Sequence, residues 1–124
     1  MRSMRLKRLD DQLRQIISET ILTKLQDPRI GFVTVTRVQL SREFDTARVY
    51  VTVYGDEQAR RETFKGLASA ASFVQAEIAK AIRLRRTPRL RFIYDETLDR
   101  SLRIHETLRD LHVDESPPTR EDGE

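Results

Sequence analysis

Residues 32–54 read FVTVTRVQLSREFDTARVYVTVY and decide the fold of this 124-residue chain. Two runs rich in β-branched residues, 32–40 and 46–54, flank the short polar segment Ser41–Asp45, which predicts two strands joined as a hairpin. In the second run, apolar residues alternate with polar and aromatic ones, so one sheet face should be buried and the other solvated. The expected inward positions are Ala47, Val49, Val51 and Val53, and the outward ones Arg48, Tyr50, Thr52 and Tyr54.

The segments that flank the hairpin carry helical periodicity. Apolar residues spaced by three and four predict a helix over residues 4–26, which the turn-forming Asp27-Pro28-Arg29-Ile30-Gly31 ends. Residues 55–86 contain no proline and carry a second apolar stripe. A straight helix of that length would reach about 45 Å, which is wider than a small domain. We therefore expect two helices joined by a bend, caused by Gly66 and the small residues 68–72.

Proline 88 ends the second helical stretch because it removes a backbone donor and restricts the preceding residue. Leu90–Tyr94 then alternate as a third strand, and residues 95–111 have the apolar spacing of a last helix. We expect residues 1–113 to form one domain. The acidic, proline-containing residues 114–124 have nothing to bury and are predicted to be disordered.

This order of elements predicts a two-layer α+β fold with a three-stranded mixed sheet, since a helical crossover sets the third strand parallel to one hairpin strand. The same order is that of type II KH domains, which bind RNA. KH domains usually clamp nucleic acid with a Gly-x-x-Gly loop between their central helices. The chain has no such loop, because its glycines are only Gly31, Gly55, Gly66 and Gly123.

Composition narrows the possible functions. The absence of cysteine excludes disulfides, thiolate metal sites and a cysteine nucleophile. No apolar run approaches the ~20 residues of a membrane span, and no leader follows the charged N-terminus, so we expect a soluble, cytoplasmic protein. Net charge is +3, and residues 114–124 carry −4, which leaves +7 on residues 1–113. That balance favours a polyanionic partner, although charge also serves solubility.

Three blocks of sequence resemble the ribosome-binding factor A family: Asp27–Thr36, Ala47–Val51 and Leu84–Glu96. The resemblance extends over residues 4 to about 111. It implies a KH type II fold whose loop is replaced by an Ala-x-Gly kink between helices, a position that Ala70, Ala71 and Ser72 occupy, with Ser72 in place of the glycine. It also implies a monomer that binds the free 30S subunit and assists its late assembly and 16S rRNA maturation.

Arginines gather around the end of the second helical stretch. Capping a helix C-terminus needs only one or two cations, whereas the planar guanidinium is well suited to phosphate, so the surplus predicts RNA binding. A second basic cluster lies near the N-terminus, and Lys80 extends the first along the helix. The predicted RNA-binding residues are Arg5, Lys7, Arg8, Lys80, Arg83, Arg85, Arg86, Arg89 and Arg91.

Other polar residues are better explained by structure than by chemistry. Tyr50 and Tyr54 have rings suited to stacking on bases, but cross-strand packing is favoured. His105 and His112 lack a third ligand, so we expect surface residues and no metal site. A cluster of acids favours helix capping over acid–base chemistry, since carboxylates stabilise helix starts. These acids are Asp95, Glu96 and Asp99.

Together these features predict a ribosome assembly factor that binds RNA without catalysis, cofactor, metal, membrane or small-molecule substrate. The sequence shows no phosphate loop, dinucleotide fingerprint or Ser/His/Asp arrangement. Two alternatives stay open. One is a basic KH-like adaptor that binds an acidic protein, and the other is a small hydrolase that uses Asp95 and Glu96.

Overall fold

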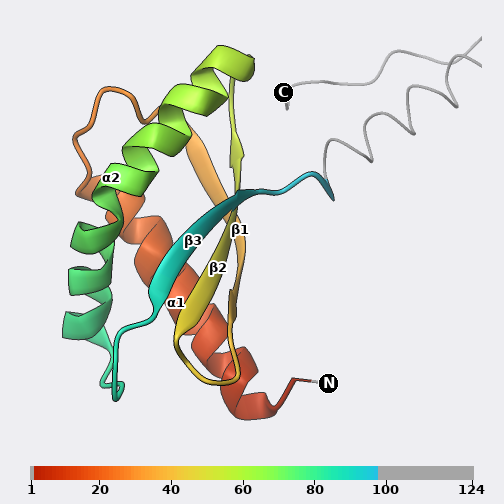
Figure 1. Ribbon diagram of the computed structural model, residues 1–124, viewed down its shortest axis with the longest axis vertical. Helices are drawn as coiled ribbons and strands as arrows, with labels where there is room; N and C mark the ends of the chain where they lie inside the picture. Colours follow the sequence, from red (N-terminus) through yellow and green to blue (C-terminus); the bar gives the residue numbers. More distant parts are fainter. Residues whose placement is uncertain (1, 98–124) are drawn as a thin grey trace, which may run out of the picture. The chain divides into compact units, whose positions relative to one another are not determined.

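The computed structural model describes residues 2–97. The chain divides into two units, Met1–Tyr94 and Asp95–Glu124, and the first contains all the elements named here. In order, these are α1 (Met4–Thr23), β1 (Val33–Leu40), β2 (Thr46–Val53), α2 (Glu57–Ala81) and β3 (Arg89–Tyr94), shown in Figure 1. The helix predicted over residues 95–111 lies almost wholly outside the described residues, and so does the predicted disordered segment 114–124.

The sheet has the order β1-β2-β3 and is mixed, because β1 and β2 pair antiparallel whereas β2 and β3 pair parallel. This confirms the predicted α+β class and the helical crossover. Alternation along β2 is also as predicted, with every second residue buried. The inward side chains of the sheet pack with the apolar stripes of α1 and α2 into one core, which includes Leu13, Ile17, Val49, Val51, Leu67, Val74 and Ile78.

Helix α1 begins where the capping rules place it. The Ser3 hydroxyl accepts a hydrogen bond from the Leu6 amide at 3.1 Å, which satisfies one of the free donors of the first turn. Leu6, Leu9, Leu13 and Ile17 follow at helical spacing and are buried. Each fully buried side chain of this kind contributes about 1.5–3 kcal/mol, so this stripe fixes α1 on the sheet.

Helix α2 corrects the prediction that residues 55–86 form two separate helices. It is a single 25-residue helix that runs through Ala70, Ala71 and Ser72 without interruption. Alanine is the strongest helix former and no proline intervenes, so the small residues continue the hydrogen-bond ladder instead of breaking it. Figure 1 shows the axis of α2 changing direction about half-way along. The helix also ends at Ala81, and residues 82–88 form an irregular connection to β3.

The Asp27–Gly31 turn fastens the connection between α1 and β1 to α2. Asp27 accepts hydrogen bonds from the backbone amide and the guanidinium of Arg29, at 2.6–3.1 Å. These bonds, above all those from the guanidinium, lower the pKa of the Asp27 carboxyl. On α2, the Thr63 hydroxyl accepts from the Gly31 amide and lies within bonding distance of the Arg29 carbonyl oxygen. The residues of this turn therefore have a structural role, which is to hold the α1–β1 connection against α2.

Gly66 allows the Asp27–Gly31 turn to approach α2 closely. A Cβ atom built on Gly66 would lie 2.5 Å from Cγ1 of Ile30, a distance that real Cβ atoms do not reach. Ile30 belongs to the turn just described and packs against the core. The glycine thus lets the turn lie directly on α2, a role different from the bend that the sequence suggested.

Candidate nucleic-acid interface

The β1–β2 hairpin and the connection that precedes β3 lie side by side. The Arg89 amide donates to the Asp45 carbonyl oxygen at 2.9 Å, and Thr46 pairs with Arg89 in the parallel ladder. The hairpin itself is closed by the Ser41 hydroxyl, which donates to the Asp45 carboxylate at 2.7 Å and accepts from the Thr46 amide. Because Arg89 is bonded to the hairpin, the arginines that directly precede it in the sequence, from residue 83 on, lie in the segment that leads to this corner of the sheet.

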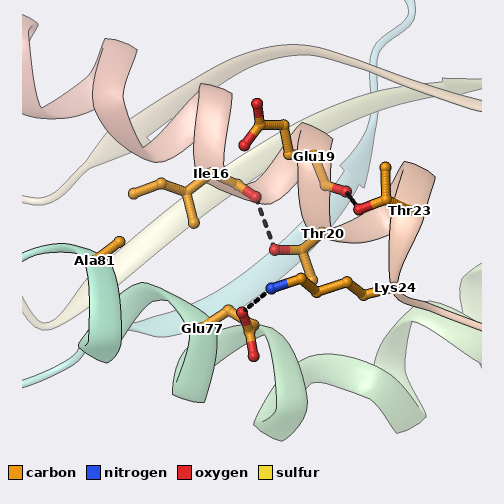
Figure 2. A pocket seen from close by; sticks show the side chains of 7 residues that line it. All are labelled: Ile16, Glu19, Thr20, Thr23, Lys24, Glu77 and Ala81. Atoms are coloured by element: carbon orange, nitrogen blue, oxygen red, sulfur yellow. Dashed lines mark hydrogen bonds and ion pairs between the residues drawn. The ribbon is translucent and has the colours of Figure 1, made fainter.

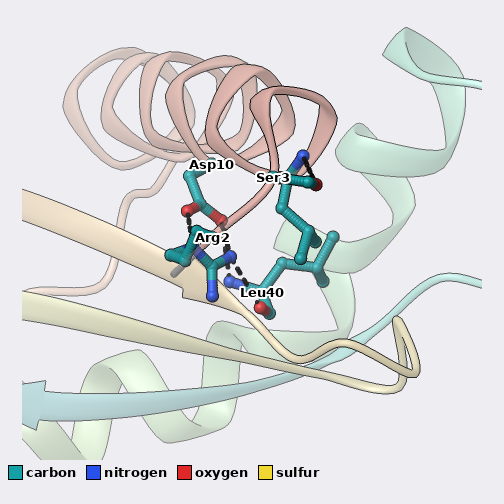
Figure 3. Close-up of polar contacts among 5 residues, drawn as sticks. Arg2, Ser3, Asp10 and Leu40 are labelled. Carbon is teal, nitrogen blue, oxygen red and sulfur yellow. Dashed lines mark hydrogen bonds and ion pairs between the residues drawn. The ribbon is translucent and has the colours of Figure 1, made fainter.

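The start of α1 is tethered to the same corner (Figure 3). The Arg2 guanidinium donates to the Asp10 carboxylate at 2.8 and 2.9 Å and to the Leu40 carbonyl oxygen at 2.8 Å. Asp10 also accepts from the Leu40 amide at 2.8 Å, so one carboxylate holds both the N-terminus and the last residue of β1. Arg2 consequently serves the fold.

Two predicted clusters thus meet around the hairpin. The Arg5 guanidinium lies over the Phe44 ring, 5.2 Å from its centroid. The exposed predicted residues are Arg5, Lys7, Arg8, Arg85 and Arg86. The hairpin adds exposed Arg42, which is not among the residues predicted from the sequence. We call this surface the basic end: the first two turns of α1, Ser41–Asp45 and residues 82–89. Figure 1 shows the three segments at the same, lower end of the unit Met1–Tyr94.

The charges at the basic end are not neutralised from within. No described carboxylate lies within ion-pair distance of the side chains of Arg83, Arg85, Arg86 or Arg89. The pKa of Asp45 is lowered, chiefly by the Ser41 hydroxyl and further by the nearby Arg86 and Arg89. Asp45 thus remains charged, and it is surrounded by cations that outnumber it. Such an excess of guanidinium groups attracts phosphate.

Lys80 is placed differently from the other predicted residues. It lies 3.2 Å from the Glu77 carboxylate, which Lys24 of the α1 C-cap approaches on its other oxygen at 2.7 Å. These two lysines, Lys24 first, lower the pKa of Glu77. Lys24 and Glu77 line a hollow of about 260 Å³ between α1 and α2, shown in Figure 2. Because Lys24 and Glu77 form an ion pair across the hollow, we interpret this pair as a link between the two helices.

Arg91 also stands apart, because it lies within β3 and not in the connection. Its register partner on β2 is Arg48, and both side chains are exposed on the sheet face turned away from the helices. On the same face the Arg37 guanidinium covers the Tyr50 ring at 3.9 Å from its centroid. This agrees with the prediction that Tyr50 packs across strands, while Tyr54 remains 67% exposed.

Within the described residues, no group of three or more His, Cys, Asp or Glu side chains is arranged to hold a metal ion. The Asp95 carboxylate accepts a hydrogen bond from the Thr97 amide at 3.0 Å, a bond typical of capping, and the helix that it was predicted to cap lies outside the described residues. His105, His112 and Asp99 lie outside the described residues. Among the described helices, none is long and apolar enough to cross a membrane.

Comparison of the sequence with known protein families identifies the family of this chain. The family model for ribosome-binding factor A matches residues 5–108. The chain belongs to the ribosome-binding factor A family. The family protein of Staphylococcus saprophyticus is 43% identical over 110 residues, which cover 89% of this chain and 96% of that one.

Solved structures from the same family share the fold. The crystal structure of ribosome-binding factor A from Thermus thermophilus is 32% identical, with a TM-score of 0.65 over 72% of this chain and 93% of that one. A homology model of the T. thermophilus protein, fitted into a cryo-EM map of a 30S complex, is 33% identical with a TM-score of 0.59 over 71% and 92%. The predicted family and fold are confirmed.

Proposed function

We propose that this chain binds the free 30S ribosomal subunit in the cytoplasm and assists its late assembly and the maturation of 16S rRNA. It acts as a monomer, by contacts with RNA and without catalysis. Membership of the ribosome-binding factor A family supports this proposal, as does the T. thermophilus relative described in a 30S complex. The observation on this chain that carries it is the convergence of three basic segments at one end.

The basic end suits ribosomal RNA for electrostatic reasons. Neutralising phosphates releases condensed counterions, which supplies most of the affinity that does not depend on sequence. Three short segments from α1, the hairpin and the β3 connection spread their guanidinium groups over a surface, which suits a folded RNA better than one linear strand. Because the segments are held together by the Asp10 and Asp45 contacts, the charges are positioned before RNA arrives. A pre-arranged surface of this kind recognises RNA by shape and charge.

Co-sedimentation tests the proposal. Full-length protein is mixed with purified free small subunits, large subunits and assembled ribosomes across a salt series. Selective binding to free small subunits that weakens with salt is expected. Equal binding to all three particles, or none, would contradict the proposal. Competition with purified 16S rRNA separates it from an adaptor for an acidic protein, whose binding should be indifferent to the RNA.

A pair of variants locates the contact. Arg85→Ala/Arg86→Ala removes two charges from the basic end, whereas Arg61→Ala/Lys65→Ala removes two from the exposed first half of α2. The α2 residues form ion pairs with Glu57 and Glu62 at the surface, which contribute little, so neither double variant should unfold the protein. The first pair should weaken binding and reduce the salt slope by about 1.8, or about 0.9 for each phosphate that is no longer neutralised, and the second should not. Equal loss of binding in the two double variants would show that the RNA does not bind at the basic end.

A further inference from the structure

The sheet face turned away from the helices carries aromatic rings and cations contributed by all three strands. We call it the open face. Inward positions such as Val49 and Val51 are fully buried, whereas the outward positions of the same strands are exposed or half-buried. Its aromatic and basic residues are Phe32, Arg37, Arg48, Tyr50, Tyr54 and Arg91.

Strand register orders these residues along the face. One row across the sheet is Gln39, Arg48 and Arg91, and the next is Arg37, Tyr50 and Ile93. At the far end the Tyr54 amide donates to the Phe32 carbonyl oxygen at 3.0 Å, which continues the ladder beyond the strands. Phe32 and Tyr54 are 69% and 67% exposed. Cations therefore lie toward the hairpin and exposed rings toward the opposite end.

A bulge shapes the middle row. The pairing of β1 with β2 shifts between Val35 and Arg37, which leaves Thr36 as the extra residue. Bulges bend the strand and redirect the following side chain. Here the Arg37 guanidinium comes to lie 3.9 Å from the Tyr50 ring centroid. A guanidinium that lies over a ring leaves its far side for a base to stack on.

The cations of the open face have no internal counter-charge in the described part of the chain. Arg48 and Arg91 are direct register partners, although like charges opposite one another destabilise a sheet. No described carboxylate lies within ion-pair distance of Arg37, Arg48 or Arg91. An external anion bound across Arg48 and Arg91 would relieve that repulsion.

We propose that the open face binds a single-stranded segment of RNA, with its phosphates on Arg48 and Arg91 and its bases on the exposed rings. Rings reach only bases that are not already paired and stacked, so the partner is a single strand and not a duplex. The inference rests on the proposed function in taking RNA as the partner. It adds a second surface, which is distinct from the basic end and recognises a different form of RNA.

Fluorescence anisotropy of the full-length chain tests this inference. The probes are a labelled, unstructured RNA of about ten nucleotides and the duplex of the same sequence, lengths within the range that such surfaces cover. Phe32→Leu/Tyr54→Leu removes two exposed rings and should weaken single-strand binding about thirtyfold or more while leaving duplex binding unchanged. Arg48→Gln/Arg91→Gln should lower the salt slope for the single strand by about 1.4. The control Arg61→Gln/Lys65→Gln should change neither. Circular dichroism checks that each variant is folded.

Three results would overturn the inference. One is equal loss of single-strand and duplex binding in the ring variant, and another is no loss at all. The third is failure of the full-length chain to bind the single strand, as expected if residues 98–124 or an acidic protein occupied this face. Co-sedimentation that persists without single-strand binding would overturn this inference alone. Single-strand binding without selective co-sedimentation would instead overturn the proposed function.

Discussion

Replacing Gly66 by alanine sets two opposing effects against each other. In an ordinary helix interior this change stabilises by about 0.5–1 kcal/mol, because alanine restricts the unfolded chain and favours the helix. Here the new methyl group would lie 2.5 Å from Cγ1 and 3.3 Å from Cδ1 of Ile30. Cγ1 is bonded to the Cβ atom of Ile30 and lies close to the backbone, so a change of rotamer alone does not remove the clash. The turn that carries Ile30 therefore has to move. Overpacking of this kind costs about 1–3 kcal/mol.

The steric cost should win, and Gly66→Ala should lower the free energy of unfolding by up to about 2 kcal/mol. The Ile30→Ala background removes both clashing atoms. There the same Gly66→Ala change should stabilise by about 0.5–1 kcal/mol, because only the helix preference is left. The sign reversal between backgrounds measures the contact directly.

Urea unfolding followed by circular dichroism gives the four free energies of the cycle. Ser72→Ala, an exposed change on the same helix, serves as the control and should be neutral or slightly stabilising. If Gly66 instead allowed α2 to bend, alanine would destabilise equally whether or not Ile30 is present. Stabilisation by Gly66→Ala in the wild-type background would refute the close approach.

Three further predictions concern carboxylates. Asp10→Ala leaves the buried Leu40 amide without its acceptor at 2.8 Å and should lower the free energy of unfolding in urea by about 1–3 kcal/mol. The exposed control Asp11→Ala should lower it little, and equal losses would contradict this prediction. Because its lysine partners lower the pKa of Glu77, that carboxylate stabilises the fold fully above about pH 4.5 and less as pH falls through the folded-state pKa. Glu77→Gln should flatten this acid-side loss in unfolding midpoints measured against pH, and an unchanged profile would refute it. Asp45→Asn removes a negative charge from the basic end and should tighten 30S binding at low salt more than at high salt; weaker binding would show that the carboxylate is needed.

Local patterns predicted most of the fold. The alternation Ala47, Val49, Val51 gave the buried face of β2 correctly, since a strand's period of two depends only on its own residues. The helical stripe of α1 succeeded for the same reason. The expected division of residues 55–86 into two helices was wrong, because the helix continues through its small residues. The role of Gly66 was also misread, since the close approach that the glycine serves is shown only by the position of Ile30. That residue is distant in sequence, so local patterns carry no information about the contact.

The charged surface was harder to predict, because the availability of a cation depends on where the acids lie. Arg2 and Arg5 look equivalent in the sequence, yet Arg2 is bound by Asp10 whereas Arg5 lies over a ring. Lys80 likewise forms an ion pair with Glu77, which it shares with Lys24. Arg42 was overlooked because a single arginine in a short turn gives no cluster signal. Only the pairing of hairpin and β3 connection brings it beside the others.

The arrangement of internal acids explains why the remaining charge is directed outward. Asp10 and Asp27 bind arginines that hold segments together, and Glu77 binds lysines that link two helices. Each of these carboxylates pairs with one or two cations. The arginines of residues 83–91 have no such acid within ion-pair distance in the described chain, so their field extends into solvent. These three acids pair with cations that hold the fold together, and none of the three is placed beside the arginines of residues 83–91. A chain of net charge +3 can in this way present a strongly basic surface.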